Sequence, residues 1–530
     1  MVTKKKFTQT DLEKLIETID KTHPQLLSLQ IKGFCIWPTV KVVFWRFLTR
    51  EFVEDESQRG NNSIISRNKL VRIKSYIVLL GKTFLSLVVG SLPNIKRFFY
   101  DRHKPFDVLI IHPNRVQSPT DGQMYDQFIG VISDLAQFNI ASIHPTSSEQ
   151  SIWETQTAAY LDLKFLNSLV VAIAIKNKIL LKNQKQSSEI AASMHDILAQ
   201  ATDSKINLPK PLLKASIAHF LATMETYILV FKSLRPKKIF VIDFDSKFGE
   251  IAAAKSLGIP TYDIQHGTFW SHDLDHSWLE SSAKFSKALP FPDYLTVRGK
   301  LWANIACELN FWKAERIIEL GCACMSRYLP NRKLPADVNL SKKKLNVLFI
   351  SGDIHVSKAY EFIFELLTEA SQHLHVIIKL HPRETEGGHP LQKLAGLFKG
   401  SVTIKHNSID IYQLILEADL VIGSNSTALI EAAALGTPTF SLGIGSKPEG
   451  LSAAHGHNKL LATILGYAAN PQSLVRQILL LKQNPTQTFN WMSEVEQNIN
   501  RIYRPDFSTN LRELIANGNT QSSDNIYSKL

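Results

Sequence analysis

The sequence predicts an α/β protein with two doubly wound, Rossmann-like domains that follow a mainly helical N-terminal region. Short apolar runs recur between helical segments, and several of these runs end in polar residues. Such alternation is typical of parallel sheets that carry helices on both faces. A polar, basic stretch then divides the alternation into two halves. With 530 residues, the chain is also longer than a single hydrophobic core usually supports.

We expect four parts along the chain, separated by changes in composition. Between the two α/β domains, residues 325–344 are polar and basic and contain two prolines, which is typical of a linker. The four expected parts are a helical region at 1–104, an α/β domain with a helical insertion at 105–325, a second α/β domain at 345–515 and a flexible tail at 516–530.

The first α/β domain is expected to open with a buried strand from Phe106 to His112. A helix from Asp121 to Leu135 and a second strand from Asn139 to Ile143 should follow. From Trp153 to Ser233 the pattern is helical, and we interpret this section as an insertion that packs on the sheet.

Two strands later in this domain end in groups that could carry chemistry. Asp243 and Asp245 lie at the end of an apolar run, and His266 follows the next run along the chain. A right-handed crossover places the carboxyl ends of both strands at one edge of the sheet, where ligands bind in such folds. Because histidine titrates near neutral pH, His266 is a candidate general base. We also name the two aspartates as catalytic candidates.

The Asp243-Phe244-Asp245 sequence has two other interpretations. A D-x-D sequence can hold a divalent cation that bridges a diphosphate. An aspartate after a strand can also cap the next helix. The parallel-sheet context argues against the metal site, and we expect no metal in this protein.

The clearest anion site is predicted in the second domain, within Asp419–Gly443 (DLVIGSNSTALIEAAALGTPTFSLG). A buried strand there delivers hydroxyl groups to the start of a small-residue helix. The unpaired N–H groups and the dipole of a helix start favour negative charge. Glu431 lies one turn inside the helix, where a carboxylate can accept hydrogen bonds from a ribose. The candidate residues of the turn and helix start are Gly423, Ser424, Ser426 and Thr427. An ordinary αβ unit with a serine cap remains the alternative.

Other donor-site candidates follow the neighbouring strands of this domain. Gly352 and His355 come after the first strand, and His381 with Pro382 comes after the next. Together with His266, these groups predict a cleft between the two domains with an anion site on one wall and a proton acceptor on the other.

Lysine and arginine outnumber aspartate and glutamate by 60 to 48, a formal net charge of +12. The excess is concentrated between Arg67 and Lys104, around the apolar run Tyr76–Leu92, which Lys82 interrupts. That run is short for a spanning helix, so we predict that this region binds a membrane surface. The alternative is a helix packed on the domain. We expect no nucleic-acid partner, because no basic and aromatic reading surface is evident.

The cysteines point to a reducing compartment. Cys35, Cys307, Cys322 and Cys324 do not form a disulfide framework, and no signal peptide is evident. We expect a cytoplasmic protein, peripheral to the inner face of the plasma membrane. Cys322 and Cys324 lack a second pair at zinc-finger spacing.

Three short motifs together resemble GT-B fold glycosyltransferases of bacterial capsule and surface polysaccharide synthesis. They are Gln265-His266-Gly267-Thr268, Leu380-His381-Pro382, and Ser426-Thr427 with Glu431, and they span roughly Lys238 to Leu442. The set looks most like bacterial sialyl- and Kdo-transferases and the CDP-glycerol glycerophosphotransferases. The resemblance implies that His381, Pro382, Ser426 and Thr427 hold a cytidine nucleotide and that His266 is a candidate base.

The sequence departs from the glycerophosphotransferase pattern at three positions. Gln265 stands in place of a tryptophan, Phe269 in place of a proline and Glu431 in place of an aspartate. These differences favour a sugar transferase over a polyol-phosphate polymerase.

The resemblance implies transfer of a sugar from a CMP-, CDP- or UDP-linked donor to a surface polysaccharide or lipid-linked glycan, without a cofactor. Alternatives are a CDP-glycerol-type glycerophosphotransferase, a nucleotide-sugar 2-epimerase and a non-catalytic scaffold of the same fold.

Overall fold

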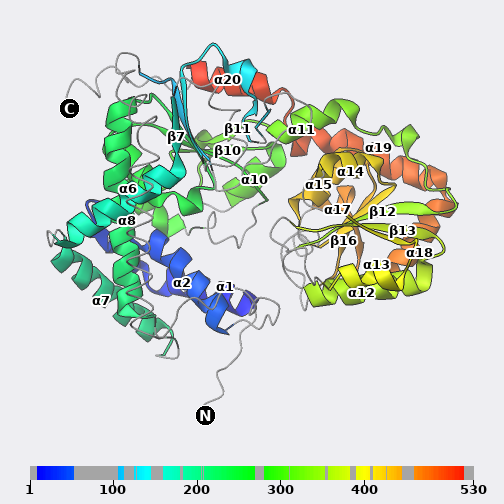
Figure 1. The fold of residues 1–530 in the computed structure, drawn as a ribbon, viewed down its shortest axis with the longest axis horizontal. Coiled ribbons are helices and arrows are strands. Elements are labelled where there is room, and N and C mark those ends of the chain that lie inside the picture. Colours follow the sequence, from blue (N-terminus) through cyan, green and yellow to red (C-terminus); the bar gives the residue numbers. More distant parts are fainter. Residues whose placement is uncertain are drawn as a thin grey trace. The chain divides into compact units, whose positions relative to one another are not determined.

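The chain forms two compact units, here called the first and the second unit (Figure 1). The first unit comprises Met1–Arg298, Trp302–Ala323 and Asp506–Leu530, and the second comprises Gly299–Leu301 and Cys324–Pro505. Residues 325–344 therefore belong to the second unit. The computed structural model describes residues 9–52, 105–112, 125–126, 128–144, 159–179, 183–203, 206, 208–268, 278, 280–308, 311–352, 356–381, 390–405, 410–424, 426–444 and 459–517.

The first unit is built on a 7-stranded parallel sheet with the order β11-β10-β9-β8-β3-β6-β7. The chain starts at β3, moves outward to β7, and returns to the other side of β3 with β8. The order thus reverses between β3 and β8, which is where a doubly wound sheet binds ligands. The strands are β3 (Val108–Ile111), β6 (Ile140–His144), β7 (Ala159–Asp162), β8 (Ile239–Ile242), β9 (Thr261–Ile264), β10 (Tyr294–Val297) and β11 (Ile317–Glu319).

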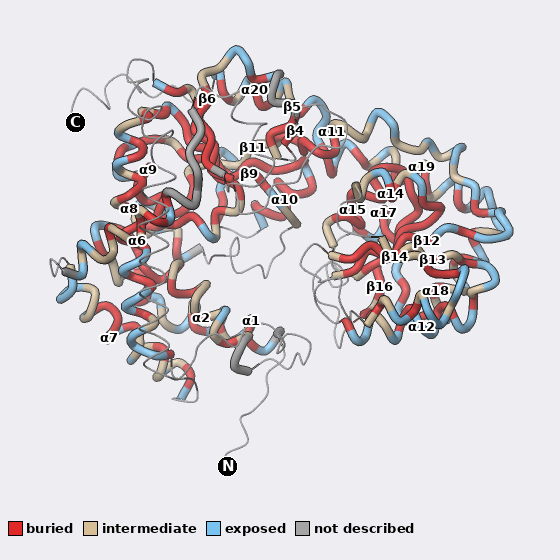
Figure 2. Tube along the Cα trace, viewed as in Figure 1, coloured by how far each residue is buried: buried red, intermediate tan, exposed pale blue. Residues whose placement is uncertain are grey.

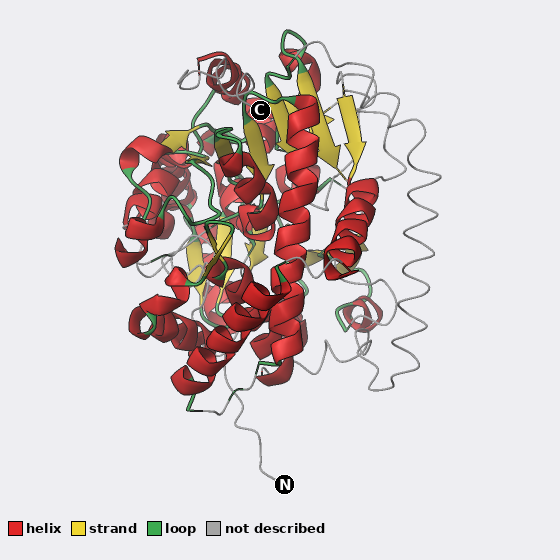
Figure 3. Ribbon diagram, turned by 90° about the vertical axis from the view of Figure 1, so that its left-hand side faces the viewer, coloured by secondary structure: helices red, strands yellow, loops and turns green. Residues whose placement is uncertain are grey.

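The long helix α8 (Lys210–Leu234) runs through the helical layer of this unit (Figure 3). It packs against α2, α6, α7 and α9, and its contact with α9 is close because Gly249 has no Cβ. A Cβ at Gly249 would lie 2.7 Å from Cβ of Thr223 on α8. Within the described residues α8 is the one helix long and apolar enough to cross a membrane, but 61% of its most apolar window is buried inside the unit.

The other helices of the first unit come from the N-terminal, central and C-terminal parts of the chain. Helices α1 and α2 pack on each other and reach α7 and α8, so residues 9–52 confirm the predicted helical N-terminal region. The apolar run Tyr76–Leu92 lies outside the described residues. The helices are α1 (Gln9–Thr22), α2 (Trp37–Phe52), α6 (Leu163–Ile179), α7 (Gln184–Ala201), α9 (Phe248–Ser256), α10 (Lys300–Glu308) and α20 (Phe507–Asn517). The first residues of α10 belong to the second unit. A short hairpin, β1 (Gln30–Ile31) and β2 (Phe34–Cys35), separates α1 from α2.

The predicted helix from Asp121 to Leu135 is wrong for its described part. That part forms two antiparallel strands, β4 (Tyr125–Asp126) and β5 (Gly130–Val131), and a 3-10 turn. The Asp126 carboxylate accepts the backbone N–H of Phe128 at 2.8 Å and that of Ile129 at 2.9 Å. Gly130 then takes φ +86°, which a glycine tolerates. The local side-chain bonds therefore compete successfully with a helix.

The sequence pattern predicts helices throughout the section from Trp153 to Ser233, and this prediction is wrong for one part of it. It contains β7, which extends the sheet in parallel beside β6. β7 has four residues and is the outermost strand of the sheet. A sequence pattern this short does not predict a strand, and β7 is recognised only by its pairing with β6.

The second unit is built on a 6-stranded parallel sheet with the order β14-β13-β12-β15-β16-β17. The order reverses between β12 and β15, so this unit is also doubly wound. The predicted fold class is therefore confirmed. The strands are β12 (Leu345–Ile350), β13 (Leu374–Lys379), β14 (Val402–Lys405), β15 (Leu420–Gly423), β16 (Thr439–Leu442) and β17 (Gly466–Ala468).

Helices flank this sheet and enclose an apolar core, which Figure 2 shows as buried chain. Val347, Val376 and Ile422 on three neighbouring strands are fully buried in it, together with Ile363 and Leu366 of α12. The helices of this unit are α12 (Val356–Ala370), α13 (Gln392–Leu397), α14 (Ile411–Glu417), α15 (Thr427–Ala434), α17 (Lys459–Ile464), α18 (Pro471–Gln483) and α19 (Pro485–Ile502). A further helix, α11 (Ala323–Tyr328), begins where the segment Trp302–Ala323 of the first unit ends.

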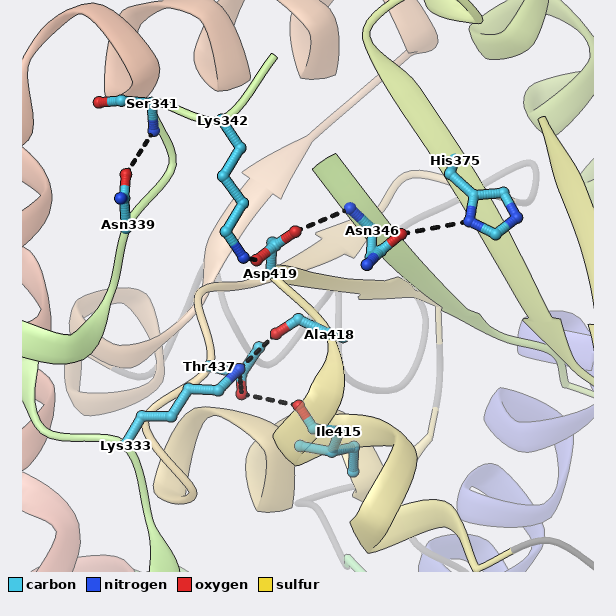
Figure 4. A network of polar contacts seen from close by, with 10 residues as sticks. All are labelled: Lys333, Asn339, Ser341, Lys342, Asn346, His375, Ile415, Ala418, Asp419 and Thr437. Carbon is cyan, nitrogen blue, oxygen red and sulfur yellow. Dashed lines mark hydrogen bonds and ion pairs between the residues drawn. The ribbon is translucent and has the colours of Figure 1, made fainter. Parts of the chain in front are cut away.

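The amino edge of this sheet, where its strands begin, carries a polar network (Figure 4). Asp419 accepts the backbone N–H of Asn346 at 2.9 Å and pairs with Lys342 at 2.5 Å. His375 lies between Asn346 Oδ1, at 3.2 Å, and Thr403 Oγ1, at 2.9 Å. The pKa of His375 is lowered, first by burial and then by Lys344 and Lys405. These side chains connect β12, β13, β14 and β15 at their starts.

Candidate functional site

The carboxyl edge of the first sheet, where its strands end, brings Asp243 and His266 together. Asp243 follows β8 and His266 follows β9, and these strands are neighbours. His266 Nε2 lies 3.5 Å from Asp243 Oδ1, with 45% of the histidine side chain exposed and 31% of the aspartate side chain. A carboxylate beside a partly exposed imidazole is the arrangement that orients a general base. The structure thus places both residues at one edge of the sheet, as the crossover rule predicted, and their catalytic roles stay a prediction.

Asp243 has a left-handed backbone, with φ +69° and ψ +62°. A non-glycine residue in this region is strained by roughly 1–3 kcal/mol, and such residues cluster at functional sites. Asp245 lies two residues on, in a 3-10 turn (Phe244–Ser246). Neither aspartate occupies the N-cap of α9, which is Lys247. Asp243 is instead the N-cap residue of the 3-10 turn, without a side-chain cap hydrogen bond, so the interpretation of these aspartates as caps is wrong for α9 only.

The turn that carries His266 is held by two buried side chains from adjacent strand ends. Arg298, which follows β10, donates from Nη2 to the His266 carbonyl at 2.9 Å. The Gln265 side chain accepts the Arg298 backbone N–H at 2.8 Å and donates to the Gly267 carbonyl at 2.8 Å. The sequence predicts Gln265 only as a motif residue and does not predict a role for Arg298. Its position directly after an apolar strand was the available signal.

A second pair of a histidine and an aspartate, this one buried, lies at the point where the strand order of the first sheet reverses. His112 follows β3, and its Nδ1 lies 3.4 Å from Asp126 Oδ2; the side chains are 0% and 2% exposed. Burial lowers the pKa of His112 most strongly, while Asp126 opposes this and Lys247 adds to it. Because the sequence placed Asp126 in a helix, this pair was not predicted.

In the second unit, two glycines lie at the corresponding reversal point, between β12 and β15. Gly423 ends β15, and a Cβ there would lie 2.9 Å from the Ile350 carbonyl oxygen on β12. Gly352 follows β12 by two residues and has open space where its Cβ would be. Gly423 therefore lets β15 pack closely against β12, whereas Gly352 leaves open space at the reversal point, where a ligand can approach the backbone.

The start of α15 has the serine cap that we gave as the alternative, and an anion site at this helix start stays a prediction. Ser426 is the N-cap, and its hydroxyl accepts the backbone N–H of Ala428 at 3.2 Å. Ser424, Ser426 and Thr427 are partly exposed, whereas the helix behind them is buried. The structure brings these residues to the same carboxyl edge as Gly352 and Gly423.

Glu431 is buried within α15, and its surroundings are now visible. Its carboxylate accepts a hydrogen bond from the Tyr412 hydroxyl at 3.1 Å. The Tyr412 ring stacks on Tyr328, with centroids 4.7 Å apart, and the Tyr328 hydroxyl donates to Asp410. Asp410 in turn caps α14. The predicted contact of Glu431 with a ribose stays a prediction, and its hydrogen bond to Tyr412 fixes one carboxylate oxygen.

His381 follows β13, which pairs with β12, so it lies at the same edge of the second sheet and is partly buried. Pro382 and His355 lie outside the described residues. That the edges of the two units share one cleft stays a prediction.

Among the described residues, the structure contains no group of three or more histidine, cysteine, aspartate or glutamate side chains that could hold a metal ion. Cys322 and Cys324 are both buried and form no disulfide. The second unit thus offers groups suited to a phosphate, and the first offers a carboxylate and imidazole pair suited to proton transfer.

Solved structures similar to this chain were found, although no protein-family model and no curated protein sequence matches it. A UDP-GlcNAc 2-epimerase from Neisseria meningitidis, bound to UDP-GlcNAc, is 14% identical, with a TM-score of 0.46 over 77% of this chain and 99% of its own. The lipopolysaccharide outer core galactosyltransferase WaaB is 12% identical, with a TM-score of 0.41 over 77% and 99%. The wall teichoic acid polymerase TagF is 11% identical, with a TM-score of 0.41 over 85% and 98%.

Proposed function

We propose that this protein is a glycosyltransferase that moves a sugar from a nucleotide-activated donor to a surface polysaccharide or lipid-linked glycan. The observation that carries the proposal is the pairing of Asp243 with His266 at 3.5 Å in one doubly wound unit, together with a hydroxyl-lined helix start at the strand-order reversal of the other.

The donor half of the proposal concerns the second unit. The donor phosphates would bind at the start of α15, near Ser424, Ser426 and Thr427, because free N–H groups and the helix dipole stabilise negative charge there. His381 would contribute a further hydrogen bond to the phosphates. Gly352 would admit the nucleotide close to the backbone, and Glu431, oriented by Tyr412, would contact the ribose.

The acceptor half concerns the first unit. His266 would accept the proton of the acceptor hydroxyl, and Asp243 would stabilise the imidazolium that forms. The acceptor oxygen would attack the anomeric carbon as the bond from that carbon to the phosphate oxygen breaks. The nucleotide would leave with that bonding pair as a phosphate, whose charge the α15 start would stabilise. No step in this scheme needs a cofactor.

A two-part experiment tests the proposal. Thermal-shift screening with CMP, CDP, UDP and GDP first identifies the nucleotide, and the matching labelled nucleotide sugars are then incubated with a lipid-linked glycan extract. Transfer of label to the glycan supports the proposal. Absence of both nucleotide binding and transfer would contradict it and would favour a non-catalytic scaffold.

The same assay separates the remaining enzyme classes. An epimerase would convert the nucleotide sugar into an isomer without any acceptor. A glycerophosphotransferase would transfer label from CDP-glycerol. Either result would replace the proposed activity.

We also propose that the protein is cytoplasmic and binds the inner face of the plasma membrane through residues 67–104. Support comes from the basic residues that flank the apolar run Tyr76–Leu92. A variant lacking Val71 to Arg97 should stay in solution when mixed with anionic vesicles. If it sediments with the vesicles as the full chain does, this membrane site is wrong.

A further inference from the structure

The His266 turn is held by a closed set of hydrogen bonds between two neighbouring strand ends. Arg298 holds the carbonyl of His266, and Gln265 holds both the Arg298 N–H and the Gly267 carbonyl. The Gln265 backbone N–H also donates to the Thr296 carbonyl at 3.2 Å. Both holding side chains are almost completely buried, Arg298 at 4% and Gln265 at 7% exposure. We call these two residues the turn clamp.

The turn clamp fixes the two peptide groups that follow the Cα of His266, those that join His266 to Gly267 and Gly267 to Thr268. The position of the imidazole depends on these peptides, because the side chain has only two rotatable bonds. A displacement of about 1 Å at a reacting group can cost roughly 100-fold in rate. The 3.5 Å approach of His266 to Asp243 therefore depends on the turn that the clamp holds.

We propose that Arg298 and Gln265 are positioning residues that hold His266 in its proton-accepting geometry. This inference rests on the proposed function. The arginine acts through its planar guanidinium, which a lysine ammonium does not reproduce. The glutamine acts through an amide that accepts on one side and donates on the other.

A double-mutant cycle tests whether Arg298 acts through His266. Arg298→Lys should lower kcat roughly 10- to 100-fold, with little change in KM for the donor. In a His266→Ala background the same substitution should have no further effect, because the group that it positions is gone. An equal loss in both backgrounds would show a merely structural role and would overturn the proposal.

Arg316 provides a matched control in the same unit. Its guanidinium also donates to two backbone carbonyls, those of Asp293 at 2.6 Å and Pro292 at 2.8 Å, at the opposite end of β10. Arg316→Lys should leave kcat unchanged in both backgrounds. A loss equal to that of Arg298→Lys would count against a special role of the turn clamp.

Two additions keep the test decisive if a variant folds poorly or if no transfer activity exists. Gln265→Met keeps the side-chain length and leaves Arg298 in place, and it should also lower kcat only when His266 is present. Modification of His266 by diethyl pyrocarbonate, followed by mass spectrometry, needs no substrate. It should be faster in Arg298→Lys than in wild type or Arg316→Lys, and equal rates would overturn the positioning role independently of the reaction.

Discussion

The amino and carboxyl edges of the two sheets differ in their polar residues: those at the amino edges bond within the fold, whereas several at the carboxyl edges are partly or largely exposed. At the amino edges, three aspartates each directly precede a strand. Each accepts a backbone N–H at the start of the neighbouring strand and also pairs with a lysine. The sets are Asp107 with Asn139 N and Lys237, Asp293 with Thr261 N and Lys255, and Asp419 with Asn346 N and Lys342. At the carboxyl edges stand glycines, hydroxyl groups and histidines.

The difference separates stability from chemistry. A carboxylate that accepts a buried N–H and pairs with a lysine has its hydrogen bonds satisfied within the fold. The carboxyl-edge residues Gly352, Ser424, Thr427 and His266 are partly or largely exposed. We infer that substitutions at the amino edges change the free energy of unfolding, whereas those at the carboxyl edges change binding and catalysis.

The largest expected effect is on turnover, at the carboxyl edges. His266→Ala should lower kcat/KM for sugar transfer by about 10²- to 10⁴-fold, the usual contribution of a positioned base. His381→Ala should also remove most of the activity, because it loses a phosphate contact. The melting temperatures of both variants should match wild type. Near-normal turnover of either variant would remove that histidine from the site.

The next effect is on stability, at the amino edge of the second sheet. Asp419→Ala should lower the free energy of unfolding by about 1.5–3 kcal/mol, because it leaves the Asn346 N–H without its charged acceptor. Chemical denaturation measures this change. Asp196→Ala is the control, since this aspartate also pairs with a lysine but lies on the surface. If the control is destabilised as much as Asp419→Ala, the amino edge has no special structural role.

Two helix caps give a smaller and sharper comparison. Ser426 caps α15 at the carboxyl edge, and Asn470 caps α18 through Ser473 N at 2.8 Å. Replacing either with alanine should cost about 1 kcal/mol of stability. Only Ser426→Ala should also weaken nucleotide binding, as measured by calorimetry. Equal affinities in the two variants would place the nucleotide elsewhere.

The last comparison concerns pH and is confined to alkaline conditions. Burial lowers the pKa of Lys333 from 10.5 to about 8, with Asp419 opposing the shift and Lys342 adding to it. Between these two pH values the unfolded chain binds more protons than the folded chain, so this group makes stability rise with pH from about 8 to 10.5. Lys333→Met should flatten that part of the denaturation profile. An unchanged slope would contradict the burial of the charge.

The strand-end residues could be predicted because parallel strands joined by right-handed crossovers place their carboxyl ends together. That rule alone brought Asp243 to His266 and Gly352 to the start of α15. It could not reveal Arg298, because the hydrogen bond of Arg298 to the His266 carbonyl depends on the pairing of β9 with β10. Nor could it show that Asp126 would accept the backbone N–H groups of a turn and face His112. The local sequence suits both a helix and such a turn.

The central claim is that the carboxyl edge of the second unit binds a nucleotide. Calorimetric titration of CMP, CDP, UDP and GDP into wild type, Ser424→Glu and Asp419→Asn tests it most directly. We predict that one nucleotide binds wild type, that it binds Asp419→Asn with the same affinity, and that Ser424→Glu abolishes binding because its carboxylate repels the phosphates. Binding of no nucleotide to wild type, or equal binding to Ser424→Glu, would contradict the claim.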